Sequence, residues 1–230
     1  MGHRSITLRS CTALLAILAG CDTPTCGDDT AEPTLAGLSA RPLVIAHRGA
    51  SGHRPEHTLA AYELAARMGA DYIEPDLVST KDGVLVARHE NEIGLTTDAE
   101  RRFGDRRATK VVDEDTIQGW FTEDFTLAEL RTLRVKEREA FRTHGYDGLY
   151  SIPTFEEVVT LAEREGRRRG RAVGLYPELK HPRYFRDIGL PLEERVLEVL
   201  PRHDLDDCGA PVFIQSFDST SLRRLRPETR

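Results

Sequence analysis

Short apolar runs alternate with amphipathic stretches along most of the chain after residue 41. Short β-branched runs are typical of buried strands, whereas apolar residues spaced by three and four positions are typical of helices. Their alternation at this spacing predicts βα units around a parallel sheet, and therefore an α/β fold. We expect strands at residues 43–46, 72–78, 84–87, 173–179 and 212–217.

Local signals add detail to this pattern. Pro75 falls inside the second predicted strand and cannot donate a ladder hydrogen bond, so we expect a bulge or a break there. Thr126 and Thr154 are positioned as the first residues of helices, and Gly69 as a helix stop. Residues 99–150 are mostly charged and interrupt the alternation, which predicts an insertion into the core fold.

The composition suits a globular protein. The 230 residues are 39% hydrophobic and 30% charged, with a formal net charge of −6. A nucleic-acid binder usually carries a basic surplus, so we expect no nucleic-acid partner. The charge leaves room for a local basic pocket that binds an anion.

The first forty residues have a character of their own. Residues 1–20 carry Arg4 and Arg9 before an apolar run, which is typical of a secretory signal and too short to span a bilayer. The letters "LAGC" ending at Cys21 resemble the lipobox of bacterial lipoproteins, in which Cys21 would carry the lipid; an ordinary signal with a chance cysteine is the alternative. Residues 21–40 read as a flexible tether before a domain at 41–230. We therefore expect an exported protein, lipid-anchored in the bacterial cell envelope.

Three carboxylates lie within predicted strands. Residues two apart in a strand share a face, so Glu74 and Asp76 point the same way, as do Glu178 and Lys180. Carboxylates are costly to bury unless they are paired or bound to a cation. The pattern leaves two possibilities open: a divalent-metal site with oxygen ligands, or simple pairing with Arg48 and Lys180.

His47 and His89 each follow a predicted strand. In a parallel barrel the carboxyl ends of the strands lie together at the face where active sites form. A histidine can take and give a proton near neutrality. A metal with Arg48 and Lys180 suits a phosphoryl substrate, and two histidines suit an in-line displacement. The other histidines, including His57 and His181, are expected to need no special role.

At this point the chain resembles the glycerophosphodiester phosphodiesterase family, and its exported bacterial branch in particular. The segments that carry the resemblance are "AHRGASGHRPEHTLAAY", "GADYIEPDLVSTKDGVLVARHE", "FTLAEL", "IPTFEEVV", "YPELKHP" and "QSFD", in family order. The resemblance implies a TIM-type (β/α)8 barrel with an insertion after the third strand. The family continues for three more strands past "QSFD", so we expect about five of the eight strands here, in a piece of a longer protein or an incomplete barrel.

The resemblance also implies an activity, the hydrolysis of glycerophosphodiesters to sn-glycerol 3-phosphate and an alcohol. It implies these roles: His47 and His89 as general acid and base, Glu74, Asp76 and Glu178 as ligands of Ca²⁺ or Mg²⁺, and Arg48 and Lys180 as phosphate contacts. Two residues depart from the family's usual pattern, His57 in place of Asn and Glu90 in place of Asp. The alternatives are phospholipase D-like cleavage of lysophospholipids or sphingolipids, and a catalytically dead, lipid-anchored binding protein.

Overall fold

A computed structural model of the chain describes residues 42–227. The predicted signal, the tether and Cys21 lie outside the described residues. Among residues 42–227 there is no helix with the length and apolar character to cross a lipid bilayer.

The strands are short and lie where apolar runs predict them, with one further hairpin. They are β1 (Ile45–His47), β2 (Tyr72–Glu74), β3 (Asp76–Ser79), β4 (Leu85–Ala87), β5 (Ala108–Val112), β6 (Asp115–Gly119), β7 (Gly174–Leu175) and β8 (Glu178–Leu179). The predicted break at Pro75 is confirmed, because β2 ends one residue before it and β3 begins one residue after it.

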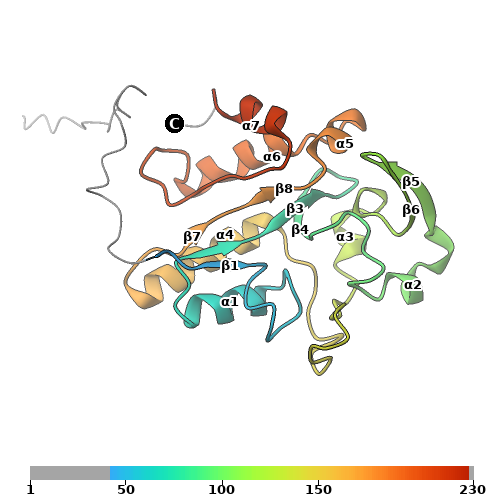
Figure 1. Ribbon diagram of the computed structural model, residues 1–230, viewed down its shortest axis with the longest axis horizontal. Coiled ribbons are helices and arrows are strands. Elements are labelled where there is room, and N and C mark those ends of the chain that lie inside the picture. The colour runs from blue at the N-terminus through green and yellow to red at the C-terminus, as the bar shows by residue number, and fades with distance from the viewer. Residues whose placement is uncertain (1–41, 228–230) are drawn as a thin grey trace, which may run out of the picture. The chain divides into compact units, whose positions relative to one another are not determined.

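Parallel pairing builds the part of the sheet that positions the site. β2 pairs in parallel with β1 on one side and with β7 on the other, and β3 pairs in parallel with β8 (Figure 1). The predicted strand at residues 212–217 is reduced to two isolated parallel bridges, from Val212 to Leu175 and from Gln215 to Glu178. β1 and β2 are parallel neighbours joined through α1, which is the βα unit that the sequence predicts.

β4 corrects the expectation of a parallel strand at residues 84–87. It pairs antiparallel with β3, with Leu77 opposite Ala87. The reason is the turn between them, in which Gly83 has a φ of +76° and donates to Thr80 O. A turn this short can join only antiparallel strands, because a parallel crossover needs about a dozen residues.

The predicted threonine caps at Thr126 and Thr154 are confirmed as the starts of two helices. The helices are α1 (Leu59–Arg67), α2 (Ala99–Arg102), α3 (Leu127–Leu130), α4 (Phe155–Arg169), α5 (Pro182–Asp187), α6 (Leu192–Val199) and α7 (Ser219–Leu225), with 3-10 turns η2 (Gly104–Arg106), η3 (Thr122–Asp124) and η4 (Leu200–His203). Thr126 and Thr154 each form a capping box with a glutamate three residues later, which satisfies two backbone donors at once. α5 and the short α2 were not predicted from the sequence.

The charged stretch at residues 99–150 contains structure of its own. β5 and β6 form an antiparallel hairpin, and α2 and α3 lie in the same region (Figure 1). The stretch is joined to the core by buried apolar side chains, among them Phe125, Leu130 and Leu133. A β3–β4 turn contact, from Lys81 N to Phe125 O at 2.9 Å, fixes its position beside the hairpin turn.

Gly49 is predicted to be irreplaceable in the turn that follows β1. Its φ is +80°, and an added Cβ would lie 2.7 Å from the backbone carbon of Ala61. A side chain there meets both a left-handed backbone and the start of α1, so Gly49→Ala should lower the free energy of unfolding by more than about 1 kcal/mol. Urea denaturation measures this loss.

Gly52, in the same loop, is the matched control for this prediction. An added Cβ at Gly52 meets nothing within 4 Å. Gly52→Ala should therefore change the free energy of unfolding by no more than about 1 kcal/mol in either direction. Equal losses in the two variants would contradict the prediction.

Candidate functional site

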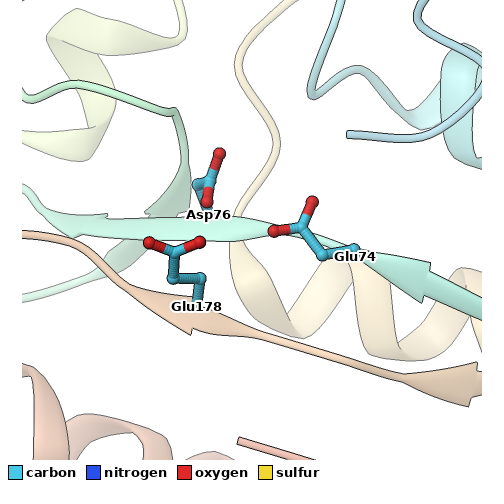
Figure 2. A group of neighbouring side chains, drawn as sticks. All are labelled: Glu74, Asp76 and Glu178. Atoms are coloured by element: carbon cyan, nitrogen blue, oxygen red, sulfur yellow. The ribbon is translucent and has the colours of Figure 1, made fainter. Parts of the chain in front are cut away.

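The three carboxylates singled out from the sequence come together. Glu74 ends β2, Asp76 begins β3 and Glu178 begins β8 (Figure 2). Asp76 and Glu178 are register partners across the β3–β8 pair. One oxygen from each of the three side chains lies within 4.8 Å of the others, and all three residues are buried. Such a set of carboxylate oxygens could hold a metal ion of the kind that prefers oxygen ligands.

The charges of this group fit a bound cation. The Oδ1 atom of Asp76 is buried and has no hydrogen-bond partner within residues 42–227. Burial, and next the charge of Asp76, raise the pKa of Glu74 to about 8. Like-charged carboxylates in a low-dielectric site cannot all stay ionised without a compensating positive charge. A divalent cation would supply that charge.

Arg48 contacts three acidic side chains of the site. Its backbone N–H donates to Glu74 Oε2 at 2.8 Å, and its Nη1 lies 3.2 Å from Glu56 Oε2. Its Nε is 3.5 Å from Asp76 Oδ2. The turn after β1, in which Arg48 has a φ of +61°, directs the guanidinium back over the carboxylates. The guanidinium of Arg48 thus pairs with Glu56 and Asp76, whereas Glu74, the partner expected in the simple-pairing alternative, accepts only from the backbone N–H of Arg48.

His57, which was expected to need no special role, is hydrogen-bonded to Asp76. Its Nε2 lies 2.8 Å from Asp76 Oδ2 and its Nδ1 lies 2.6 Å from the hydroxyl of Tyr62. His57 is fully buried, and burial lowers its pKa despite the neighbouring carboxylate. Burial alone would raise the pKa of Asp76, but the hydrogen bond from His57 counteracts burial, and the pKa of Asp76 is lowered. The departure from the Asn usual at this position was the only sequence signal.

Lys180 and His89 adjoin the carboxylates from the other side. Lys180 Nζ lies 3.0 Å from Glu178 Oε1 and 3.4 Å from His89 Nε2. His89 was expected to follow a parallel strand, but it follows β4, which is antiparallel to β3. The end of β4 lies beside the start of β3, where Arg88 N donates to Asp76 O. The hairpin therefore returns His89 to the level of the acidic residues.

His47 is the last residue of β1 rather than the residue after it, and it is the register partner of Glu74. Neighbouring strands lie about 4.8 Å apart, so His47 borders the carboxylate group. Partial burial, and then the charge of Arg48, lower the pKa of His47, which favours the neutral ring. The structure thus gathers all seven side chains singled out from the sequence around one point.

A cleft of about 1290 Å³ opens beside this group. Its walls include Glu178, Lys180 and His181 from the β8 end, and residues 113–115 at the tip of the β5–β6 hairpin. Acidic and basic side chains both line it. A cleft of this size accommodates a small organic ligand next to the carboxylates.

The model of the "Glycerophosphoryl diester phosphodiesterase family" matches residues 47–230. The chain belongs to the glycerophosphoryl diester phosphodiesterase family. The match begins at His47 and includes every residue of the site described above.

Individual members of the family are similar in sequence to this chain. The chain is 39% identical over 198 residues to a glycerophosphodiester phosphodiesterase of Arabidopsis thaliana, covering 80% of this chain and 52% of that protein. It is 30% identical over 228 residues to a glycerophosphodiester phosphodiesterase of Haemophilus influenzae, covering 94% and 61%. The chain thus spans between half and two thirds of the length of these two relatives.

Solved structures of the family share the fold. One is a phosphodiesterase of Oleispira antarctica in complex with sn-glycerol-3-phosphate, with a TM-score of 0.55 and 29% identity over 81% of this chain and 63% of that one. Another, from Silicibacter pomeroyi, has a TM-score of 0.60 and 25% identity over 84% and 64%. The parallel strands described here are part of a TIM-type (β/α)8 barrel, as predicted.

The high pKa of Glu74 gives a testable pH dependence of stability. Its pKa is about 8 in the fold against an ordinary 4.5, so the folded chain binds this proton more tightly than the unfolded chain. Protonation of Glu74 therefore stabilises the fold as the pH falls from above 8 towards 4.5. After treatment with a chelator, Glu74→Gln should melt at a higher temperature than the wild type at pH 9, and the difference should nearly vanish at pH 5.

Glu63→Gln is the control in this thermal melt. Glu63 is a carboxylate that pairs with Arg67 on the outer surface of α1. Its substitution should give no gain in melting temperature at pH 9. A Glu74→Gln difference that is equal at the two pH values would show that burial does not raise the pKa of Glu74.

Proposed function

We propose that this chain hydrolyses glycerophosphodiesters to sn-glycerol 3-phosphate and an alcohol. The observation that carries the proposal is the convergence of two histidines, two cationic side chains and three buried carboxylates at one end of the barrel strands. The Oleispira antarctica relative, in complex with sn-glycerol-3-phosphate, supports this substrate class. The cleft beside Glu178 and Lys180 offers space for the rest of the diester.

Glu74, Asp76 and Glu178 would hold a divalent cation, and we propose Ca²⁺ or Mg²⁺ because all three ligands are carboxylate oxygens. When bound, the cation would neutralise negative charge on the phosphate. Arg48 and Lys180 would contact the remaining phosphate oxygens. Arg48 already lies within ion-pair distance of Asp76, and Lys180 of Glu178, so little movement is needed for them to reach a phosphate held there.

His47 and His89 would manage the protons of the reaction. Water adds to phosphorus while the bond from phosphorus to the alcohol oxygen breaks, so one proton leaves the water and one joins the alcohol. One histidine takes the first proton and the other gives the second. Because burial and the charge of Arg48 lower the pKa of His47, its neutral ring is available as a proton acceptor.

An assay with glycerophosphocholine tests the proposal. The chain should release glycerol 3-phosphate, and a chelator should abolish the release until Ca²⁺ or Mg²⁺ is restored. His47→Ala and His89→Ala should each lower kcat by about 10²-fold to 10⁴-fold, because each removes one proton-transfer group.

The exposed His53, in the loop after β1, gives the control variant His53→Ala, which should retain full activity. Release that persists with the chelator and in His47→Ala would contradict the proposal. A lysophospholipid and sphingomyelin belong in the same panel. Turnover of those lipids in place of glycerophosphocholine would favour the phospholipase D-like alternative, and a folded chain without any turnover would favour a binding protein.

We also propose that the protein is exported and anchored to a membrane through lipid on Cys21. The support is the sequence alone: the charged start, the apolar run and the "LAGC" ending of residues 1–21. Lipid chains on one terminal residue would hold a globular domain at a membrane without a spanning helix.

Expression in a bacterial host tests the anchor. The wild type should sediment with the membrane fraction and take up labelled fatty acid. Cys21→Ser should lose the label and move to the soluble fraction, whereas Cys11→Ser, within the signal, should behave as the wild type. A Cys21→Ser protein that keeps the label would contradict lipidation at this residue.

A further inference from the structure

His181 lies between two carboxylates of separate segments. Its Nε2 is 2.9 Å from Glu90 Oε2, and its Nδ1 is 2.7 Å from Asp113 Oδ2 at the tip of the β5–β6 hairpin. Carboxylate oxygens only accept when ionised, so both ring nitrogens must donate, and this requires the protonated ring. Burial lowers the pKa of His181, but the hydrogen bonds with Glu90 and Asp113 outweigh it and raise the pKa.

Glu90 extends the arrangement to His89. Its Oε2 accepts from His181, while its Oε1 lies 2.6 Å from His89 Nδ1. Nδ1 of His89 makes no hydrogen bond within residues 42–227, so the Glu90 carboxylate acts on His89 through its charge at short distance. Burial would raise the pKa of Glu90, but the hydrogen bond with His181 and then the contact with His89 lower it. Glu90 is therefore an anion fixed between two imidazole rings.

The opposite nitrogen of His89 faces Lys180, which pairs with Glu178 of the carboxylate group. Nε2 of His89 lies 3.4 Å from Lys180 Nζ, and an ammonium group can only donate. Nε2 must then carry the lone pair, and the ring proton lies on Nδ1, on the side of Glu90. A carboxylate behind an imidazole selects one tautomer and one ring orientation in the same way in many catalytic and metal sites.

The backbone at His181 supports a specific role for this side chain. Its φ is 50° and its ψ is 41°, in the left-handed region that residues other than glycine seldom adopt. Pro182 follows as the first residue of α5. Such a conformation persists where surrounding contacts hold it, and the two carboxylates provide those contacts.

We propose that His181 is a positioning residue for His89 and acts through Glu90. It holds the Glu90 carboxylate at Nδ1 of His89, and this keeps the acceptor nitrogen of His89 directed at the site. Since Asp113 binds the other side of His181, the β5–β6 hairpin is part of the same support. This inference rests on the proposed function, in which His89 transfers a proton.

Nitrogen-15 NMR of histidine-labelled chain tests the positioning directly, because the ring shifts of His89 report its tautomer. The wild type should show the proton on Nδ1. His181→Asn should shift His89 towards the other tautomer, since asparagine tolerates the left-handed backbone but is too short to bridge Glu90 and Asp113. Glu90→Gln, which keeps the side-chain size, should do the same.

Turnover of glycerophosphocholine gives the second readout. His181→Asn and Glu90→Gln each remove support from His89. Each should lower kcat by about 10-fold to 100-fold and leave KM within about twofold. His144→Asn is the matched control, because His144 Nδ1 pairs with Asp147 Oδ2 at 3.0 Å instead. It should change neither the His89 shifts nor kcat.

The two readouts separate this inference from the proposed function. If the wild type has no phosphodiesterase activity, the proposed function fails while the NMR shifts still decide whether His181 orients His89. If His181→Asn and Glu90→Gln are folded by circular dichroism and keep the wild-type His89 shifts, the positioning role is wrong, whatever the activity.

Discussion

The repulsion among three buried carboxylates is the constraint on which the rest of the site depends. Glu74, Asp76 and Glu178 are brought within 4.8 Å of one another by the pairing of β2 and β3 with their neighbours. Left alone, such a group favours proton uptake, as the high pKa of Glu74 indicates. Arg48, Lys180 and the hydrogen bond from His57 each offset part of this repulsion, and a bound cation would offset the remainder.

Much of the fold can be predicted from local sequence, because apolar runs and threonine caps act over a few residues. The pairing of β4 was mispredicted, although the short turn before it already excludes a parallel connection. The bridges at residues 212–217 depend on partners far along the chain, which the hydrophobic period does not reveal. The β5–β6 hairpin is local, with Val112 opposite Asp115, but it lies in the charged stretch, where no apolar run indicates a strand. The site residues inferred from the sequence do lie close together. A charged side chain buried within a strand needs a partner of opposite charge or a hydrogen bond, and the other buried polar residues provide it.

The supporting residues were harder to find from sequence than those facing the cleft. His57 and His181 sit in loops, where a histidine usually needs no explanation. Their importance comes from what lies behind them: Tyr62 and Asp76 for one, Glu90 and Asp113 for the other. Those partners come from four different segments, so only the tertiary structure shows the arrangement. Both histidines also have a positive φ, which side-chain patterns do not disclose.

The break at Pro75 divides one edge of a barrel strand between two independent neighbours. Arg48 N donates to Glu74 O just before the proline, and Arg88 N donates to Asp76 O just after it. Pro75 has no backbone N–H, and it lies where pairing with β1 has ended and pairing with β4 begins. The loop that presents Arg48 and the excursion that begins with β4 can therefore lengthen, shorten or be exchanged separately during evolution, while the acidic residues between them keep their spacing.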